Sequence, residues 1–176
     1  MKRRHFSSLA VGFPTIVNAS ALGLSGAVPP SDRITMATIG VGGMGQGHIR
    51  EFLKIPDVRI VAVCDVDDLN LVKAKGMIDT GYASPDCATY RAFEEVLLRR
   101  DIDAVSIALP DHWHGIVAVR AAQAGKDIYG EKPLAHNFRE GVAIREAVKR
   151  NRRIWQTGSW QRSRENFRRA CELVRN

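Results

Sequence analysis

The sequence predicts an α/β fold: a doubly wound parallel sheet with helices on both faces. From residue 34 onward, short apolar runs alternate with helical patterns, and this alternation is typical of parallel sheets. The length of 176 residues suits one domain with a good core and hardly two. With 45% hydrophobic and 26% charged residues, the composition excludes a disordered or fibrous chain.

Six strands and six helices are expected in alternation. The apolar runs predict strands at residues 34–39, 58–64, 88–90, 104–109, 127–129 and 154–157. The segments between and after them predict helices at residues 44–53, 67–78, 93–100, 112–124, 137–149 and 165–175. Asn137 followed by Glu140 is a capping-box pattern for the fifth helix. Gly125 suits the position just past the end of the fourth helix.

Residues 1–30 have the layout of an export signal. Lys2, Arg3 and Arg4 precede a mostly apolar, uncharged stretch that runs to about residue 28. Two arginines, one further residue and Phe6 resemble a twin-arginine signal, which predicts a periplasmic or other extracytoplasmic protein. The alternative is a disordered basic N-terminus. No other stretch reaches the ~18 apolar residues of a membrane helix, so no stable membrane span is expected.

The formal charge of +7 is unevenly distributed along the chain. Residues 28–138 carry 12 basic and 15 acidic residues, whereas residues 139–176 carry 11 basic and 4 acidic ones. A basic surface can indicate nucleic-acid binding. Here the basic residues are spread over two helices that each have an apolar face, so solvated helix surfaces explain them and no nucleic-acid partner is expected.

Neither the cysteines nor the histidines predict a metal site. Cys64, Cys87 and Cys171 lie far apart and form no C-x-x-C pair, so neither a zinc ribbon nor a disulfide framework is indicated. His112 and His114 stand two residues apart, a spacing that does not share a helix face.

A glycine-rich segment joins the first predicted strand to the first predicted helix. Gly40, Gly42 and Gly45 fit G-x-G-x-x-G, and Asp65 ends the next strand 20 residues after Gly45. Together these features form the dinucleotide-binding fingerprint. The expected cofactor-binding residues of this segment are Gly40, Gly42, Gly43, Met44, Gly45 and Asp65.

The acid at position 65 favours NAD over NADP as the cofactor. A carboxylate can accept hydrogen bonds from the ribose hydroxyls and would repel a 2′-phosphate. No arginine follows Asp65 closely; the next residues are Val66, Asp67 and Asp68. A glycine turn without a ligand, and an S-adenosylmethionine site, are the alternatives for this segment alone.

Two later segments fall at the same carboxyl edge of the sheet, where ligands bind in such folds. Pro110 and His114 follow the fourth strand, and Glu131, Lys132 and Pro133 follow the fifth. A lysine in a partly desolvated crevice can exchange a proton with a substrate hydroxyl. Lys132 is therefore the candidate catalytic residue. The further candidate cofactor-binding residues are Pro110, His114, Glu131, Lys132 itself and Pro133.

These motifs resemble the glucose–fructose oxidoreductase / inositol dehydrogenase / MocA (Gfo/Idh/MocA) family. The resemblance rests on G-x-G-x-x-G, the acid 20 residues later, Pro-x-x-x-His and Glu-Lys-Pro, and it covers about residues 34–176. It implies an NAD(P)-binding Rossmann domain followed by an α+β domain, and NAD(P)-dependent oxidation or reduction of sugars, inositols or related polyols. It also implies that Lys132 lies near the nicotinamide and the substrate, and His114 beside the cofactor crevice. The leader and residues 156–159 look like the exported branch.

Family members are about twice this length, so the resemblance implies that the substrate domain is missing. We expect a leader at residues 1–30, a Rossmann domain at 31–160 and the start of a linker helix at 161–176. A homo-oligomer would then form through the missing domain. Two alternative functions stay open: an NAD-dependent glycoside hydrolase on the same scaffold, and a truncated, non-catalytic dinucleotide-binding module.

Overall fold

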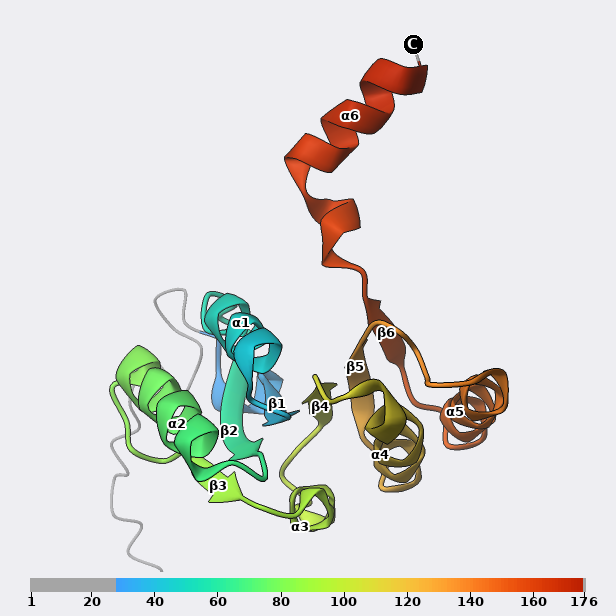
Figure 1. Ribbon diagram of the computed structural model, residues 1–176. Coiled ribbons are helices and arrows are strands. Elements are labelled where there is room, and N and C mark those ends of the chain that lie inside the picture. Colours follow the sequence, from blue (N-terminus) through green and yellow to red (C-terminus); the bar gives the residue numbers. More distant parts are fainter. Residues whose placement is uncertain (1–27, 176) are drawn as a thin grey trace, which may run out of the picture. The chain divides into compact units, whose positions relative to one another are not determined.

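A computed structural model of the chain describes residues 28–175 (Figure 1). These residues divide into two units after Asp32. The first holds a single 3₁₀ turn, η3 (Pro30–Asp32), and the second begins at Arg33. Most of the predicted leader lies outside the described residues. None of the helices within residues 28–175 combines the length and the apolar character that crossing a bilayer requires.

The second unit is built on a sheet of six parallel strands. Their order across the sheet is β3-β2-β1-β4-β5-β6, and every neighbouring pair is parallel. The strands are β1 (Ile34–Ile39), β2 (Val58–Cys64), β3 (Ala88–Tyr90), β4 (Ala104–Ile107), β5 (Asp127–Glu131) and β6 (Trp155–Gly158). This order is that of the dinucleotide-binding α/β fold, so the predicted fold class is confirmed.

Helices cover both faces of the sheet (Figure 1). The covering helices are α1 (Gly43–Phe52), α2 (Asp68–Tyr82), α3 (Phe93–Leu98), α4 (Asp111–Gln123) and α5 (Phe138–Arg150). A 3₁₀ turn, η4 (Trp160–Ser163), and a last helix, α6 (Glu165–Arg175), follow β6, and α6 has no buried residue. One core packs α1 and α2 against Met36 and Ile60. The other packs α3, α4 and α5 against Ala37 and Ile39. Successive side chains of a strand point to opposite faces, so each central strand contributes to both cores.

Two predicted helix-end features, the cap at Asn137 and the glycine after α4, are confirmed in chemical detail. The Oδ1 atom of Asn137 accepts a 3.0 Å hydrogen bond from the N–H of Glu140 and so caps α5. Gly125 follows α4 with φ +77°, a left-handed conformation that glycine adopts without steric cost. Asp67 caps α2 through the N–H of Leu69, and that helix runs on to Tyr82, beyond its predicted end.

Two strand ends differ from the prediction. The fourth strand, expected to reach residue 109, ends at Ile107, because the chain turns there towards Pro110, the N-cap of α4. The fifth strand, expected to end at residue 129, continues to Glu131, because Gly158 of β6 pairs with it. Glu131 therefore lies within the sheet rather than in the loop after it.

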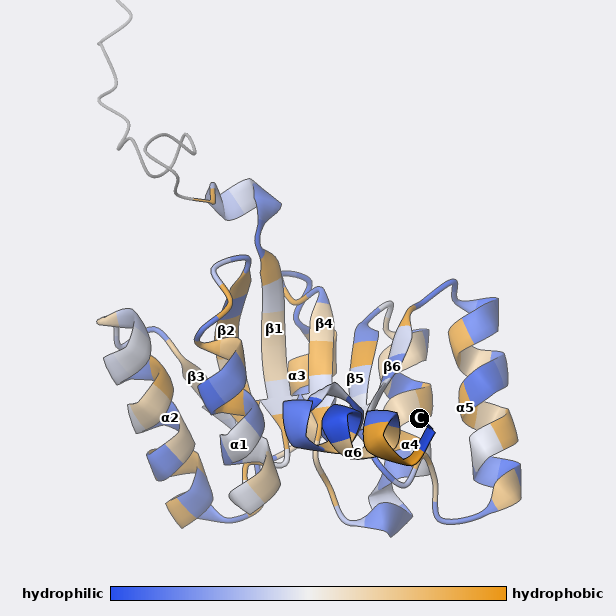
Figure 2. Ribbon diagram, turned by 90° about the horizontal axis from the view of Figure 1, so that it is seen from above, coloured by the Kyte–Doolittle hydropathy of each residue, from blue (hydrophilic) through white to orange (hydrophobic). Residues whose placement is uncertain are grey.

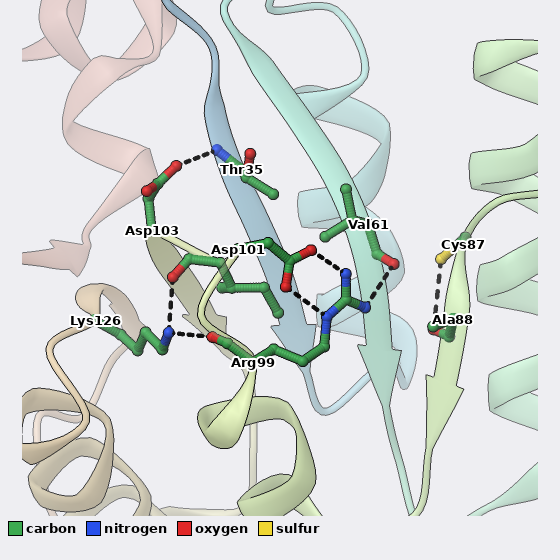
Figure 3. Close-up of polar contacts among 9 residues, drawn as sticks. Thr35, Val61, Cys87, Ala88, Arg99, Asp101, Asp103 and Lys126 are labelled. Atoms are coloured by element: carbon green, nitrogen blue, oxygen red, sulfur yellow. Dashed lines mark hydrogen bonds and ion pairs between the residues drawn. The ribbon is translucent and has the colours of Figure 1, made fainter. Parts of the chain in front are cut away.

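A polar cluster closes the amino edge of the sheet (Figure 3). The Nζ of Lys126 donates to the carbonyls of Arg99 and Ile102 at 2.5 and 2.8 Å, and burial lowers the pKa of this ammonium. The guanidinium of Arg99 pairs with Asp101 and reaches the carbonyl of Val61. These bonds fix the loops opposite the carboxyl edge, where the predicted ligand site lies.

The two basic C-terminal helices differ in how they pack. The apolar face of α5 buries Ile144 and Ala147 against the core. Along α6 the described side chains are all exposed, including Phe167, Leu173 and Val174. Figure 2 shows the alternation of hydrophobic and hydrophilic residues along α5.

Candidate dinucleotide site

The glycine-rich turn between β1 and α1 has the geometry that its sequence predicts. Gly40 has φ +82°, and a Cβ there would overlap the carbonyl of Ala108. A Cβ at Gly45 would overlap the carbonyl oxygen of Gly40. Glycine at position 45 therefore lets α1 begin directly against the end of β1, and glycine at position 40 lets the turn pass close to the chain after β4.

The N-terminus of α1 is open to a ligand. The N-cap is Gly42, which supplies no side-chain cap, and the first turn contains no acidic residue. A Cβ at Gly42 or Gly43 would meet nothing within 4 Å, and the neighbouring Met44 is exposed. The first N–H groups of a helix have no intrahelical partner and lie at the positive end of its dipole. This surface fits a pyrophosphate.

Asp65 is joined to the glycine-rich turn directly. Its Oδ2 accepts a 2.7 Å hydrogen bond from the N–H of Val41, and its Oδ1 accepts a 2.9 Å bond from the N–H of Asp67. A carboxylate has about four acceptor positions, so two remain for ribose hydroxyls. The turn, the α1 N-terminus and this carboxylate together suit a dinucleotide such as NAD.

The histidine after β4 ties two loops of the site together. The buried ring of His114 lies 2.6 Å through Nδ1 from the carbonyl of Pro133 and 2.9 Å through Nε2 from the carbonyl of Leu109. The Pro110–His114 and Glu131–Pro133 segments are thus adjacent, as predicted. The ring of His114 contacts backbone at both nitrogens, and so holds the loops that border the crevice.

Glu131 points into the protein. Its Oε1 lies 2.8 Å from Nε2 of His48 on α1, and Nδ1 of His48 lies 2.9 Å from Oγ of Ser106 on β4. All three side chains are buried. Burial, and then the charge of Glu131, raises the pKa of the neighbouring Tyr129 phenol.

Lys132 and Pro133 are the exposed members of the Glu-Lys-Pro motif, whereas Glu131 is buried. The N–H of Lys132 donates to Oε2 of Glu131 at 3.1 Å, and its peptide bond to Pro133 is cis. Within the described part of the chain, no hydrogen bond or ion pair holds its ammonium, which leaves that group available to a ligand at the carboxyl edge.

Residues 28–175 contain no set of side chains arranged to bind a metal ion. No group of three or more His, Cys, Asp or Glu side chains in that range could hold an ion. His112 is exposed, while His114 is buried. An apolar groove of about 820 Å³ along α5 and β6 includes none of the motif residues in its lining.

Comparison with known proteins agrees with this site. A family profile described as an oxidoreductase family with an NAD-binding Rossmann fold (GFO_IDH_MocA) matches residues 34–159. The chain belongs to the Gfo/Idh/MocA oxidoreductase family. The resemblance expected from the motifs is therefore confirmed, and the sheet order is that of the family's N-terminal Rossmann domain.

Individual Gfo/Idh/MocA relatives carry different names. Glycosyl hydrolase family 109 protein 2 of Shewanella sp. (strain ANA-3) is 36% identical over 131 residues, which are 72% of this chain and 28% of the relative. Myo-inositol 2-dehydrogenase from Lactobacillus plantarum is 29% identical with a TM-score of 0.72, over 82% of this chain and 41% of that one.

A second solved structure shares the fold. Scyllo-inositol dehydrogenase from Lactobacillus casei, solved with NAD(H) and scyllo-inositol, is 24% identical with a TM-score of 0.70, over 81% of this chain and 41% of that one. The chain thus spans less than a third of the length of the hydrolase relative and about two fifths of the dehydrogenases.

One residue of this site, His48, was not predicted from the sequence. It lies three positions after Gly45, on the side of α1 that faces the sheet, and it meets Ser106, a polar residue within an apolar strand. The sequence did offer one signal, because His48 and Ser106 are polar residues at positions whose spacing predicts burial. No local sequence pattern linked either residue to Glu131.

Proposed function

We propose that this chain is the cofactor-binding part of an NAD-dependent oxidoreductase that acts on a sugar, an inositol or a related polyol. The observation that carries the proposal is the convergence of two motifs at one sheet edge. The glycine-rich turn with Asp65 offers a dinucleotide site, and the Glu131–Pro133 segment brings a free lysine to the same edge.

The proposed chemistry needs few groups from this chain. NAD, when bound, would supply the acceptor for a hydride from a carbinol carbon of the substrate. The N-terminus of α1 and the loop glycines bind the pyrophosphate, and Asp65 orients the adenosine ribose. The neutral amine form of Lys132 binds the substrate hydroxyl and takes its proton as the carbon becomes a carbonyl, and the resulting ammonium returns that proton in the reverse direction.

We infer that NAD is preferred over NADP. Asp65 and the two acids that follow it, Asp67 and Asp68, place negative charge where a 2′-phosphate would lie. The nearby guanidinium of Arg91 binds Asp68 at 3.2 Å and the carbonyl of Val66 at 2.9 Å. That cation is therefore partly neutralised, which lowers its attraction for a phosphate.

The substrate class is supported by the inositol dehydrogenase from Lactobacillus plantarum. The second candidate function, NAD-dependent glycoside hydrolysis, is favoured by relatives named glycosyl hydrolase family 109, one of them 36% identical. In that chemistry NAD held at the same turn and at Asp65 would serve as a transient hydride acceptor, with no net oxidation of the glycoside. The same cofactor site serves both reactions.

Two assays separate these functions. Titration with NADH, followed by nicotinamide fluorescence, tests the shared premise, and no binding at millimolar cofactor would refute both. An oxidoreductase reduces added NAD in the presence of a polyol, whereas the hydrolase cleaves an aryl glycoside without added cofactor. NADH binding with neither turnover by this chain, together with turnover by a longer form of the protein, would support the truncated, non-catalytic dinucleotide-binding module. Lys132→Met should retain NADH binding and lose turnover.

We further propose that the protein is exported through a twin-arginine signal in residues 1–30, and that it forms a homo-oligomer. The first proposal rests on Arg3, Arg4 and Phe6 in the sequence. Fusion of residues 1–30 to a reporter should give periplasmic signal that is lost when both arginines become lysine. Light scattering of the purified protein tests the second proposal.

A further inference from the structure

A buried polar couple, formed by His48 and Glu131, lies at the start of the Glu-Lys-Pro segment. Nε2 of His48 is 2.8 Å from Oε1 of Glu131, and Nδ1 of His48 is 2.9 Å from Oγ of Ser106. Glu131 is 4% exposed, His48 8% and Ser106 0%. With Glu131 ionised, Nε2 carries the proton and donates it to the carboxylate, because a carboxylate only accepts.

The residues packed around this couple restrict the orientation of the Glu131 carboxylate. The rings of Phe52 and Tyr129 pack edge-on against the imidazole at centroid distances of 6.1 and 5.1 Å. Gly158 of β6 lies against the carboxylate, and a Cβ there would come within 2.7 Å of Oε1. The oxygen that binds His48 therefore fits only because position 158 has no side chain.

The second oxygen of Glu131 reaches the residue that the proposed reaction uses. Oε2 accepts the N–H of Lys132 at 3.1 Å. One residue further on, the carbonyl of Pro133 is held by His114 at 2.6 Å. The backbone of Lys132 is thus fixed on both sides, by His48 through Glu131 and by His114 through Pro133.

We propose that His48 is a positioning residue for Lys132, acting through Glu131. The proposal rests on the proposed function, in which Lys132 exchanges a proton with the substrate hydroxyl. His48 orients the Glu131 carboxylate so that Oε2 meets the Lys132 N–H. Positioning of this kind matters because a reactive group displaced by about 1 Å can lose much of its catalytic effect.

If His48 only stabilised the core, it would not need to hold the Lys132 backbone in place. A buried ion pair is often replaceable by apolar residues of similar volume without loss of stability. If the contact between His48 and Glu131 served stability alone, its removal would leave amide exchange at Lys132 unchanged in any variant whose core stays packed. That difference provides the test.

The test uses a matched pair of substitutions at position 48. The amide nitrogen of glutamine reaches about as far as Nε2, whereas that of asparagine reaches only about as far as Nδ1. His48→Gln thus preserves the donor to Glu131, and His48→Asn preserves the contact with Ser106 alone. Ser106→Ala removes the other bond of the imidazole and serves as the control for general loss of packing.

Amide hydrogen exchange of Lys132 in the intact chain is the first readout, with thermal unfolding recorded for each variant. We expect exchange at Lys132 to rise about tenfold or more in His48→Asn and to stay within about threefold of the wild type in His48→Gln and Ser106→Ala. Equal exchange in His48→Asn and the wild type, or equal acceleration in all three variants, would overturn the proposal.

Glu131→Gln covers the case in which His48→Asn fails to fold. Its amide oxygen can still accept from His48, but its NH₂ group cannot accept the Lys132 N–H. We expect faster exchange at Lys132 with a smaller fall in the unfolding midpoint than His48→Asn shows. Unchanged exchange in Glu131→Gln refutes the coupling.

NADH titration and turnover keep the two proposals apart. Absence of NADH binding by the wild type refutes the proposed function, while the exchange data still decide whether His48 holds the Lys132 backbone. With a polyol that the wild type oxidises, His48→Asn should lower kcat about tenfold and leave KM for NAD within about twofold. A change in KM alone would contradict a positioning role.

Discussion

The N–H of Val41 donates a 2.7 Å hydrogen bond to Oδ2 of Asp65, which links the glycine-rich turn after β1 to the end of β2. Oδ1 of the same carboxylate accepts the N–H of Asp67. Asp65 therefore shapes the turn that, in the proposed function, would hold the pyrophosphate, and its remaining acceptor positions would serve the ribose. Loss of its charge should affect both parts of a dinucleotide.

Asp65→Asn should weaken NADH binding about 10- to 100-fold, because an amide cannot accept at both positions and bonds to a charged group contribute about 1.5–3 kcal/mol. The preference for NADH over NADPH should narrow in the same variant. Fluorescence titration with both nucleotides measures the two effects. Asp67→Asn is the control, since asparagine caps helices as well as aspartate does, and its NADH affinity should stay within about twofold of the wild type.

Gly45→Ala and Gly42→Ala should separate folding from binding. A methyl group at Gly45 overlaps the carbonyl oxygen of Gly40, while one at Gly42 meets nothing within 4 Å. We expect Gly45→Ala to lose about 1–3 kcal/mol of unfolding free energy. Gly42→Ala should unfold like the wild type and bind NADH at least about tenfold more weakly, because its methyl group occupies the open surface of the turn. Urea unfolding and NADH titration test the pair, and equal stability of the two variants would contradict the packing argument.

Most of the fold followed from the sequence because its determinants are local. Parallel strands buried on both faces read as continuous apolar runs, and those at residues 34–39 and 58–64 have the predicted bounds. The capping box at Asn137 and the glycine after α4 act within one helical turn. The fingerprint from Gly40 to Asp65 also has fixed spacing, which is why its residues could be assigned to one ligand.

The couple between His48 and Glu131 lay beyond such reasoning. The two residues are 83 positions apart, and their contact depends on α1 crossing β4 to reach β5. No hydrophobic periodicity in the sequence predicts a contact between His48 and Glu131. The extension of β5 to Glu131 depends similarly on pairing with Gly158, so the sequence alone placed Glu131 in a loop that faces the cofactor instead of in the sheet.

His114→Leu should destabilise the protein by about 1–3 kcal/mol. The buried imidazole contacts the carbonyls of Leu109 and Pro133. A neutral imidazole donates to only one of them, and an acceptor left without its donor costs about 1–3 kcal/mol. Chemical denaturation measures the loss. His112→Leu is the matched control two residues away, where the side chain is exposed, and it should stay within about 0.5 kcal/mol of the wild type. Equal effects at the two positions would show that the loop contacts of His114 contribute nothing.

The buried thiols should make stability fall at alkaline pH. Burial, and then the charge of Asp65, raises the pKa of Cys64 to about 12, and burial, then Asp79, raises that of Cys87 to about 11, from an ordinary value of 9.0. Above pH 9 the unfolded chain releases these protons while the folded protein retains them, so folding stability is full below pH 9 and declines towards pH 11–12. Cys64→Ala should reduce that slope in denaturation measured from pH 8 to 11.

In the native protein at pH 8, a thiol reagent should label the exposed Cys171 well before the buried Cys64 and Cys87. Equal labelling of all three cysteines would contradict this burial.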